Sequence, residues 1–340
     1  MKGFQVRVFA ARHVTALNLA AFLFTLTLGS SAALAAEKVS IALGWIPGGE
    51  RTHYYVARAR GFFAEEGLDV SIIAGKGATD AITKVASGNA DFAEAGFESL
   101  LMAKARGDVP LTGVMVVMSK MPDALIVPAG SGIKSLADLA GKKVATSPFT
   151  SSNGPWPYLL KNNGIDPDKV QLLKVDAAAL TPMLAAGQVD GIIQFVTNLP
   201  LTEAALNSVG KKAQALTWSD YGLKGYSVSL MVSNKTLATR RDMVVKMVRA
   251  VKRGMEAVRQ DPHRAAQDLK ASIPEADVAL TEAVVRASLP VMFNEVSDRD
   301  GLGVFTPELL QAMWKRVSTE QNIPIEKLDP ITTVDFSLAK

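Results

Sequence analysis

The chain has 340 residues with a formal net charge of +4, and 48% of its residues are hydrophobic. This length exceeds what one hydrophobic core usually supports and predicts two lobes, while the lack of a basic face interleaved with aromatic residues argues against a nucleic-acid partner. The absence of cysteine excludes disulfides, thiol nucleophiles, Cys-ligated metals and a lipidated N-terminal cysteine.

The first 35 residues have the pattern of a secretory signal peptide. Its basic start contains Lys2, Arg7 and Arg12. An apolar run follows at 16–28, shorter than the ~20 residues of a membrane-spanning helix. Residues 33–35 (Ala-Leu-Ala) fit the A-x-A cleavage pattern, so we expect cleavage after about Ala35. Removing three cations and no acids leaves a mature chain near +1, because +4 less three is +1.

Alternating apolar residues and breaker-rich loops predict an α/β pattern in the first part of the mature chain. The expected strands span 38–45, 68–74, 91–95, 111–119 and 123–127. The expected helices span 56–66, 79–86 and 97–106.

A second α/β segment follows, and after it the pattern is mostly helical. The second segment contains a short helix at 135–139, strands at 143–146 and 191–196, and helices at 156–163, 177–186 and 198–208. The final part contains a strand at 226–233 and helices at 241–259, 263–272, 276–287 and 306–319.

One order of motifs occurs twice, about a hundred residues apart. Each copy reads strand, polar loop, helix, strand, helix, Gly-x-apolar-Asp and strand. The closing motif is Gly88-Asn89-Ala90-Asp91 in the first copy and Gly187-Gln188-Val189-Asp190 in the second. Since open α/β sheets bind ligands at the carboxyl ends of their strands, two facing copies predict a cleft-binding protein.

The expected fold class is therefore α/β, with two α/β lobes that form a clamshell joined by a two-strand hinge. We assign residues 36–125 and 228–340 to a discontinuous lobe 1, and residues 126–227 to lobe 2. The chain would cross between the lobes near 122–126 and near 225–229.

No sequence motif points to catalysis. The nucleophile-elbow and Walker patterns are absent, and neither His53 nor His263 has a partner at metal-ligand spacing. His263 fits a solvated helix end, whereas His53 opens the first helix that faces the cleft, so it is a candidate ligand residue. We expect no catalytic residue, no metal and no cofactor.

Two tryptophans occupy equivalent positions in the two copies. Trp45 ends the first strand and Trp156 begins the matching helix of the second copy. Two opposing indoles could clamp a planar ligand or seal the cleft, and each could instead belong to a core. We favour the ligand interpretation because polar loop residues surround both.

Side chains near the strand ends give further candidates. Those of the first copy are Tyr54, Phe97, Glu98 and Ser99, and those of the second are Ser151, Gln194 and Asn198. Glu98 could accept hydrogen bonds from a ligand or cap its own helix, and Asn198 could bind a polar ligand edge or act as an N-cap.

Several segments resemble one family of transport proteins. The segments are 42–47 (ALGWIP), 53–57 (HYYVA), 61–70 (GFFAEEGLDV), 87–92 (SGNADF) and 135–145 (SLADLAGKKVA). They are similar to periplasmic substrate-binding proteins of the nitrate/sulfonate/taurine and thiamine-pyrimidine group. The similarity covers essentially the whole mature chain.

This resemblance implies a type II-like periplasmic clamshell that feeds an ABC importer in the inner membrane. It implies a periplasmic monomer that takes a small-molecule ligand and docks on the permease. In thiamine-pyrimidine relatives the Trp-x-Pro loop helps to sandwich a ring, and Trp45-Ile46-Pro47 matches it, although residues 48–51 (GGER) depart from the usual Asn/Thr-rich continuation.

We therefore expect a receptor for a planar heterocycle or an aromatic acid. The alternative ligand is an alkanesulfonate-, taurine- or nitrate-type oxyanion, held by helix N-termini and hydroxyl groups at Ser99, Thr150, Ser151 and Ser152. Two different roles also stay open at this point, namely a ligand-sensing subunit and an exported enzyme on the same fold that uses His53 and Glu98. The fungal pyrimidine synthases that share the fold rely on a cysteine-rich segment, which this chain lacks.

Overall fold

The computed structural model describes Met1 and residues 36–107 and 109–339, so the expected signal peptide lies outside the described residues. The strands are β1 (Glu37–Leu43), β2 (Leu68–Ile73), β3 (Phe92–Gly96), β4 (Leu111–Val116), β5 (Asp123–Pro128), β6 (Lys143–Thr146), β7 (Gln171–Lys174), β8 (Gly191–Phe195), β9 (Ala213–Thr217) and β10 (Val228–Ser233).

Thirteen α-helices connect or follow these strands in the described ranges. They are α2 (Thr52–Ala59), α3 (Phe62–Glu65), α4 (Ala78–Ala86), α5 (Phe97–Arg106), α6 (Trp156–Asn162), α7 (Leu180–Ala185), α8 (Leu199–Asn207), α9 (Asn234–Thr239), α10 (Arg241–Gln260), α11 (Pro262–Ser272), α12 (Val278–Met292), α13 (Glu295–Asp300) and α14 (Pro307–Glu320). Within those ranges no helix is long and apolar enough to cross a membrane.

The sheet of lobe 1 has the strand order β2-β1-β3-β10-β4. Strands β1, β2 and β3 are parallel, and β10 is antiparallel to both of its neighbours. Ile41 and Leu43 of β1 are buried in one core cluster, whereas Ala42 between them is buried in another. Both faces of the sheet are thus covered, as is usual for parallel strands connected by helices.

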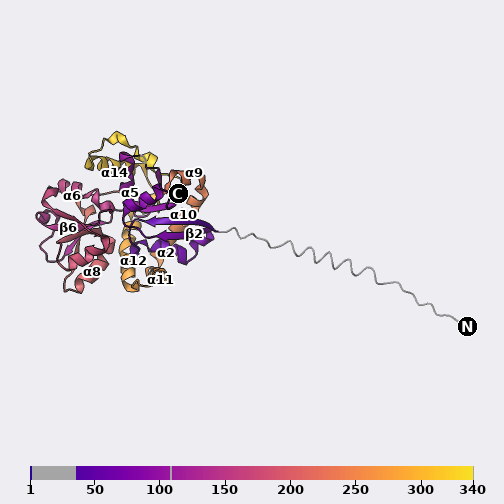
Figure 1. Ribbon diagram of the computed structural model, residues 1–340, viewed down its shortest axis with the longest axis horizontal. Coiled ribbons are helices and arrows are strands. Elements are labelled where there is room, and N and C mark those ends of the chain that lie inside the picture. Colours follow the sequence, from indigo (N-terminus) through magenta and orange to yellow (C-terminus); the bar gives the residue numbers. More distant parts are fainter. Residues whose placement is uncertain (2–35, 108, 340) are drawn as a thin grey trace. The chain divides into compact units, whose positions relative to one another are not determined.

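The sheet of lobe 2 has the strand order β7-β6-β8-β5-β9. Strands β6, β7 and β8 are parallel, and β5 is antiparallel to β8 and β9. Val144 and Ala145 of β6 belong to core clusters on opposite faces. In Figure 1 the lobe 2 elements β6, α6 and α8 lie together, apart from β2, α2 and α10 of lobe 1.

The repeated Gly-x-apolar-Asp motif makes the same connection in both lobes. Asp91 Oδ2 accepts a hydrogen bond from the backbone N–H of Ser40 on β1 at 2.8 Å. Asp190 Oδ2 accepts one from Lys143 N–H on β6, also at 2.8 Å. In each case the aspartate joins the start of the third strand to the first strand of its lobe, so the sequence repeat corresponds to a structural repeat.

Two segments that cross between the sheets pair with each other. The N–H groups of Val117 and Met118 both donate to the Val228 carbonyl at 2.9 Å, and Ser227 N–H donates to the Met118 carbonyl at 3.0 Å. Strand β5 lies wholly in the second sheet, so residues 123–125, which the sequence assigned to lobe 1, belong to the sheet of lobe 2. The two edge strands of the second sheet, β7 and β9, were absent from the predicted elements.

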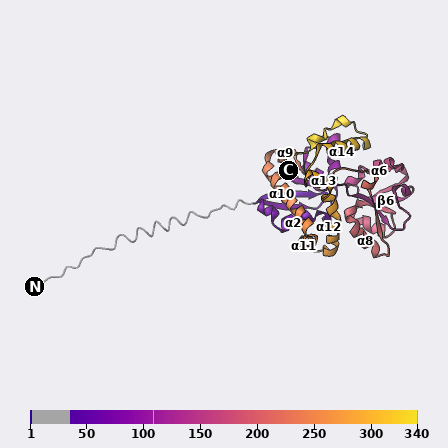
Figure 2. The ribbon, with the colours of Figure 1, turned by 180° about the vertical axis from the view of Figure 1, so that it is seen from behind.

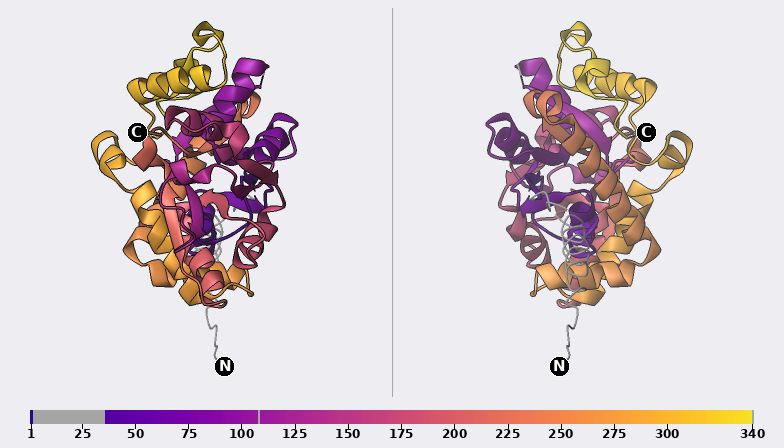
Figure 3. Two further views of the ribbon diagram at one scale, coloured as in Figure 1. Left: turned by 90° about the vertical axis from the view of Figure 1, so that its left-hand side faces the viewer. Right: turned by 90° about the vertical axis from the view of Figure 1, so that its right-hand side faces the viewer.

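The C-terminal helices pack mainly on lobe 1. Helix α10 lies against α2, and α14 lies against α5. Helix α12 contacts α11 and also α8 of lobe 2, so it touches both lobes. Figure 2 shows α12 between α11 and α8 from behind, and in Figure 3 the orange and yellow C-terminal helices run along one flank.

Candidate functional site

A cavity of about 30 Å³ lies between the lobes, at the carboxyl ends of β1, β3 and β8. Lobe 1 lines it with Gly44, Trp45, Glu50, Arg51, Ala78, Ala95, Gly96 and Val228, and lobe 2 lines it with Thr150, Ser151, Ser152, Ile193, Gln194, Phe195 and Asn198. This volume holds only one or two water molecules. The two lobes are therefore closed on each other at the predicted ligand site.

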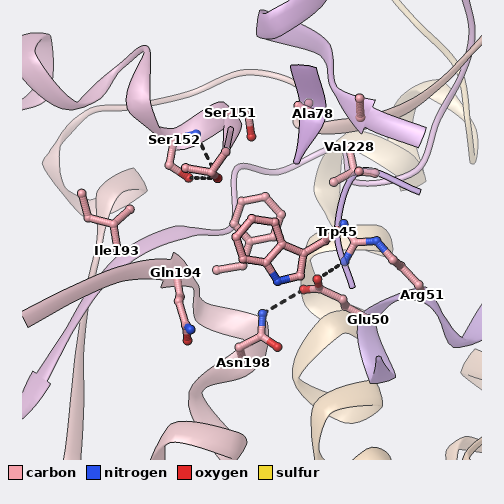
Figure 4. Close-up of a pocket in the computed structure, with 15 residues that line it drawn as sticks. Trp45, Glu50, Arg51, Ala78, Ser151, Ser152, Ile193, Gln194, Asn198 and Val228 are labelled. Atoms are coloured by element: carbon pink, nitrogen blue, oxygen red, sulfur yellow. Dashed lines mark hydrogen bonds and ion pairs between the residues drawn. The ribbon is translucent and has the colours of Figure 1, made fainter. Parts of the chain in front are cut away.

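Trp45 lies in the middle of this cavity, between the two lobes (Figure 4). Its loop follows β1 and is bound to the loop after β2, because Gly75 N–H donates to the Trp45 carbonyl at 3.1 Å. A Cβ atom on Gly75 would lie 1.6 Å from the Leu43 carbonyl oxygen, so only glycine allows this close approach. The indole is half-buried and presents a flat apolar surface to the cavity.

Below Trp45, lobe 1 carries a buried charged cluster of Glu50, Arg51 and Glu94, none of them more than 3% exposed. Arg51 Nη1 pairs with Glu50 Oε1, and Arg51 Nε donates to Glu94 Oε2 at 3.1 Å. Gly44 N–H donates to the same Glu94 oxygen at 2.8 Å, which ties the cluster to the loop of Trp45.

The guanidinium of this cluster stays charged. Burial lowers the pKa of Arg51, but the carboxylates of Glu94 and Glu50 outweigh burial and hold the pKa above its usual value. Two carboxylates and one guanidinium give the cluster a formal charge of −1.

Glu50 also reaches across the cleft to lobe 2. Its Oε2 accepts a hydrogen bond from Thr197 Oγ1 at 2.6 Å and another from Asn198 Nδ2 at 3.2 Å. Both donors lie in the turn Val196–Asn198 that follows β8. One carboxylate therefore joins the charged cluster of lobe 1 to the strand-end turn of lobe 2 (Figure 4).

Two glycines let the lobes approach closely beside the cavity. A Cβ atom on Gly96 would lie 2.5 Å from Ser151 Cβ, and one on Gly77 would lie 2.3 Å from the Phe149 carbonyl oxygen. Gly96 and Gly77 belong to lobe 1, whereas Ser151 and Phe149 belong to lobe 2. A side chain at either glycine would hold the closed lobes apart.

A second polar cluster lies behind Ser152. Ser152 Oγ donates to Asp123 Oδ1 at 2.6 Å, while Glu98 Oε2 accepts from Arg316 Nη2 at 2.7 Å and Arg316 Nη1 pairs with Glu320. Burial, and then the negative charge of Glu98, raise the pKa of Asp123 to about 6 against the Ser152 hydrogen bond. Burial and the charge of Glu98 also raise the pKa of Glu320.

The structure brings four of the ten predicted site residues to the cavity, namely Trp45, Ser151, Gln194 and Asn198. The other six lie elsewhere. Phe97 is fully buried against Phe305, Ser99 is half-buried on α5, and Glu98 pairs with Arg316 instead of facing a ligand.

The sequence predicted that Trp156 would oppose Trp45 across the cleft. In the structure it does not. It is 2% exposed and packs on Trp218 with ring centroids 5.5 Å apart, inside the core of lobe 2. The short turn Ser151–Asn153 precedes α6 and occupies the place at the cavity that we expected for this tryptophan.

His53 and Tyr54 lie inside α2, are at most 1% exposed and do not line the cavity. Burial, and then the positive charge of Arg51, lower the pKa of His53 to about 3, so its imidazole is neutral at pH 7. Neither ring nitrogen has a hydrogen-bond partner among the described residues. A neutral buried histidine of this kind is a poor acid–base group.

Sequence reasoning missed Glu50 and Glu94. Glu50 stands in the glycine-rich loop after the first strand, and its place beside Arg51 was the one local signal of a polar site. Its lobe 2 partner Thr197 is 147 residues away, so no local pattern could identify the contact. The described ranges contain no group of His, Asp or Glu side chains arranged to hold a metal ion.

Comparisons with known proteins agree with this architecture. Residues 49–265 match the family described as NMT1/THI5 like. A formylaminopyrimidine-binding protein of Halalkalibacterium halodurans is 26% identical over 268 residues, which cover 78% of this chain and 80% of that protein. The riboflavin-binding protein RibY of Chloroflexus aurantiacus is 26% identical over 288 residues, or 82% of this chain and 79% of that protein.

An enzyme is also among the relatives. A 4-amino-5-hydroxymethyl-2-methylpyrimidine phosphate synthase of Legionella pneumophila is 25% identical over 282 residues, which cover 80% of this chain and 87% of the synthase. The similarity to relatives named as binding proteins and as a synthase means that the family alone does not decide between the two roles.

Solved structures confirm the predicted two-lobed fold. The periplasmic aliphatic sulphonate-binding protein SsuA of Escherichia coli has a TM-score of 0.70 at 15% identity and covers 89% of this chain and 99% of its own. The alkanesulfonate-binding protein SsuA of Xanthomonas axonopodis pv. citri, bound to MOPS, has a TM-score of 0.69 at 17% identity and covers 88% and 99%. Given this fold and the match over residues 49–265, the chain belongs to the NMT1/THI5-like family.

Proposed function

We propose that this protein is a solute-binding receptor whose lobes close on a small planar ligand. The observation that carries the proposal is the position of Trp45 in a cavity that both lobes line. Ligand pockets that serve binding combine an apolar surface with a few convergent polar groups, and Trp45 with Glu50, Gln194 and Asn198 meets that description.

Ligand entry requires the lobes to separate. A cavity of about 30 Å³ is far smaller than the ~300–1,000 Å³ sites that hold small molecules. The paired crossing segments at Val117 and Val228 provide the place where the chain can bend. A ligand then stabilises the closed form only if it contacts both lobes, because differential affinity for the two states is what shifts their populations.

A planar heterocycle suits this site better than an oxyanion. Trp45 offers a ring face for stacking, and the names of two relatives refer to pyrimidine and flavin ligands. The Ser152 hydroxyl, which an oxyanion site would use as a donor, already donates to Asp123. A buried carboxyl group behind that hydroxyl disfavours a bound anion.

The receptor would deliver its ligand to a membrane importer. The structural similarity to a periplasmic binding protein of Escherichia coli and to a ligand-binding component of an ABC-type import system of Staphylococcus aureus supports a periplasmic location and an ABC permease as the partner. The signal-peptide pattern in the first 35 residues agrees with export. We propose that the protein acts as a monomer.

The enzymatic alternative has weaker support from the site. The two candidate catalytic residues have other surroundings. His53 is buried and neutral inside α2, and Glu98 pairs with Arg316. Neither side chain lines the cavity.

Native mass spectrometry of the protein purified without refolding tests the receptor role. We expect a retained small molecule of one defined mass, and a rise in the thermal midpoint when it is added back. A Trp45→Ala variant purified in the same way should retain less of it. The proposal fails if nothing is retained and no pyrimidine, flavin, aromatic acid or sulfonate raises the midpoint. Conversion of the molecule during incubation would favour the enzyme.

A further inference from the structure

We infer that Glu50 selects ligands that present an N–H donor or a positive charge to the cleft, and that it rejects anions. This inference rests on the proposed receptor function and specifies the chemical class of the ligand. Glu50 qualifies because it lines the cavity, is 3% exposed, and belongs to the loop that carries Trp45.

The Glu50 carboxylate is held in place but still has acceptor capacity. An ionised carboxylate offers about four lone-pair sites on its two oxygens. Arg51 takes one site, and Thr197 and Asn198 take two more. One site remains, so a ligand N–H can bind to Glu50 without breaking the bridge between the lobes.

The charged cluster has one more negative charge than positive charge, because two carboxylates share one guanidinium. Arg51 is shared by Glu50 and Glu94, and Glu94 Oε1 has no hydrogen-bond partner among the described residues. Glu94 does not line the cavity whereas Glu50 does, so a donor or a cation on the ligand would meet this negative charge at Glu50. An anionic ligand, such as a sulfonate or a carboxylate, would add to this surplus of negative charge.

Lobe 2 supplies no charge that could offset this surplus. The residues with which it lines the cavity are Thr150, Ser151, Ser152, Ile193, Gln194, Phe195 and Asn198, and all of them are neutral. Arg51 is the one cation among the residues that line the described cavity, and both carboxylates already pair with it. An anion in the cavity would therefore face Glu50 without a free cation.

A matched pair of pyrimidines tests this selectivity. The probes are 4-amino-2-methylpyrimidine, which carries an N–H donor, and 2-methylpyrimidine-4-carboxylate, which carries a negative charge on the same ring. Calorimetry on the full mature chain should give a preference for the amine on the order of ten- to a hundredfold, as expected for hydrogen bonds to a charged group.

Variants separate recognition from lobe closure. Glu50→Gln should reduce the preference to within about threefold, because it removes the charge and half of the acceptor capacity. Thr197→Val removes a lobe 2 donor to Glu50 and should weaken both probes by a similar factor, which leaves the preference intact. Glu326→Gln, at an exposed position, should change neither affinity.

The outcomes distinguish this inference from the receptor function. A wild-type protein that binds the carboxylate at least as tightly as the amine overturns the role of Glu50 but leaves the receptor function standing. An unchanged preference in a folded Glu50→Gln also overturns it. If Glu50→Gln does not fold, two other results test the role of Glu50. These are the preference of the wild type for the amine and the retention of that preference in Thr197→Val. Loss of all small-molecule binding would instead overturn the receptor function.

Discussion

The two lobes share a strand topology but present different chemistry to the cleft. Lobe 1 contributes the indole of Trp45 and the charged pair of Glu50 and Arg51, whereas lobe 2 contributes hydroxyl and amide groups such as those of Ser151 and Asn198. The repeated aspartates show that the strand connections are alike in both copies. The difference lies in the loops after the strands, so one scaffold presents different side chains at the same place in its two copies.

Lobe 1 is the preorganised side. Arg51, Glu94 and the Gly44 N–H all belong to this lobe, so their contacts would persist if the lobes separated. Thr197 and Asn198 stand on lobe 2, so their hydrogen bonds to Glu50 would break if the lobes separated. The contacts within lobe 1 should therefore govern stability, and those between the lobes should govern closure.

The largest expected effect comes from removing the cation of lobe 1. Arg51→Met leaves Glu50 and Glu94 buried without their partner, which should lower the free energy of unfolding by about 3–5 kcal/mol. Urea unfolding followed by circular dichroism measures this change. Arg58→Met, on the exposed face of the helix that follows, should cost less than about 1 kcal/mol. Equal losses in the two variants would contradict a stabilising charged cluster.

The next effect concerns pH and the lobe 2 side of the cleft. The pKa of Asp123 is about 6 in the folded protein, above the ordinary value of 3.8. Between pH 3.8 and pH 6, Asp123 is therefore protonated in the folded protein and ionised in the unfolded chain. The free energy of unfolding contributed by this group is therefore highest below pH 4 and falls as the pH rises to 6, by at most about 3 kcal/mol.

Asp123→Asn removes this titration. The variant should be more stable than the wild type above pH 6, and the difference should vanish below pH 4. Urea unfolding at a series of pH values checks the prediction, with exposed Asp220→Asn as the correction for losing one carboxylate. A constant difference between wild type and Asp123→Asn at all pH values would contradict the raised pKa.

A methyl group at Gly96 should act on closure alone. Its backbone angles, φ −60° and ψ 125°, suit alanine, but the new Cβ would meet Ser151 Cβ at 2.5 Å. Overpacking of this kind costs about 1–3 kcal/mol and would fall on the closed form. Small-angle scattering of Gly96→Ala should give a larger radius of gyration, and adding Ser151→Gly should restore the wild-type value. A double variant that stays as open as the single one would exclude this contact as the cause.

The smallest expected effect is the difference in ligand affinity between substitutions at the two tryptophans. Trp45→Phe keeps an aromatic ring and should weaken binding of the aminopyrimidine probe by about 0.5–1.5 kcal/mol. Trp156→Phe should leave that affinity unchanged and lower the thermal midpoint, because Trp156 packs on Trp218 in the core. Calorimetry and thermal unfolding on both variants give the comparison. An affinity loss confined to Trp156→Phe would return the ligand site to the second tryptophan.

Sequence reasoning was most successful where the signal is local. Alternation and glycine punctuation predicted most strands, and the two Gly-x-apolar-Asp motifs correctly indicated equivalent connections around Asp91 and Asp190. The segments 42–47 and 61–70 also identified the family that the comparisons show. Each of these features depends on residues close together in the chain.

The cleft was harder to predict because its contacts are not local. Glu98 stands at a strand end, yet its partner Arg316 is 218 residues away and withdraws it from the cavity. Trp156 stands at a helix start, but the side on which that helix buries its tryptophan depends on packing against Trp218. Sequence position indicated which loops reach the cleft and could not indicate which side chains they present.

The place of β10 in the first sheet has a consequence for how the chain folds during synthesis. Strand β10 (Val228–Ser233) lies between β3 and β4, so the first sheet remains in two parts, with unpaired strand edges, until residue 233 has been made. All five strands of the second sheet lie within residues 123–217. Lobe 2, in the middle of the sequence, can therefore finish folding first. The sheet of lobe 1 begins the chain but is completed only after β10 has been made.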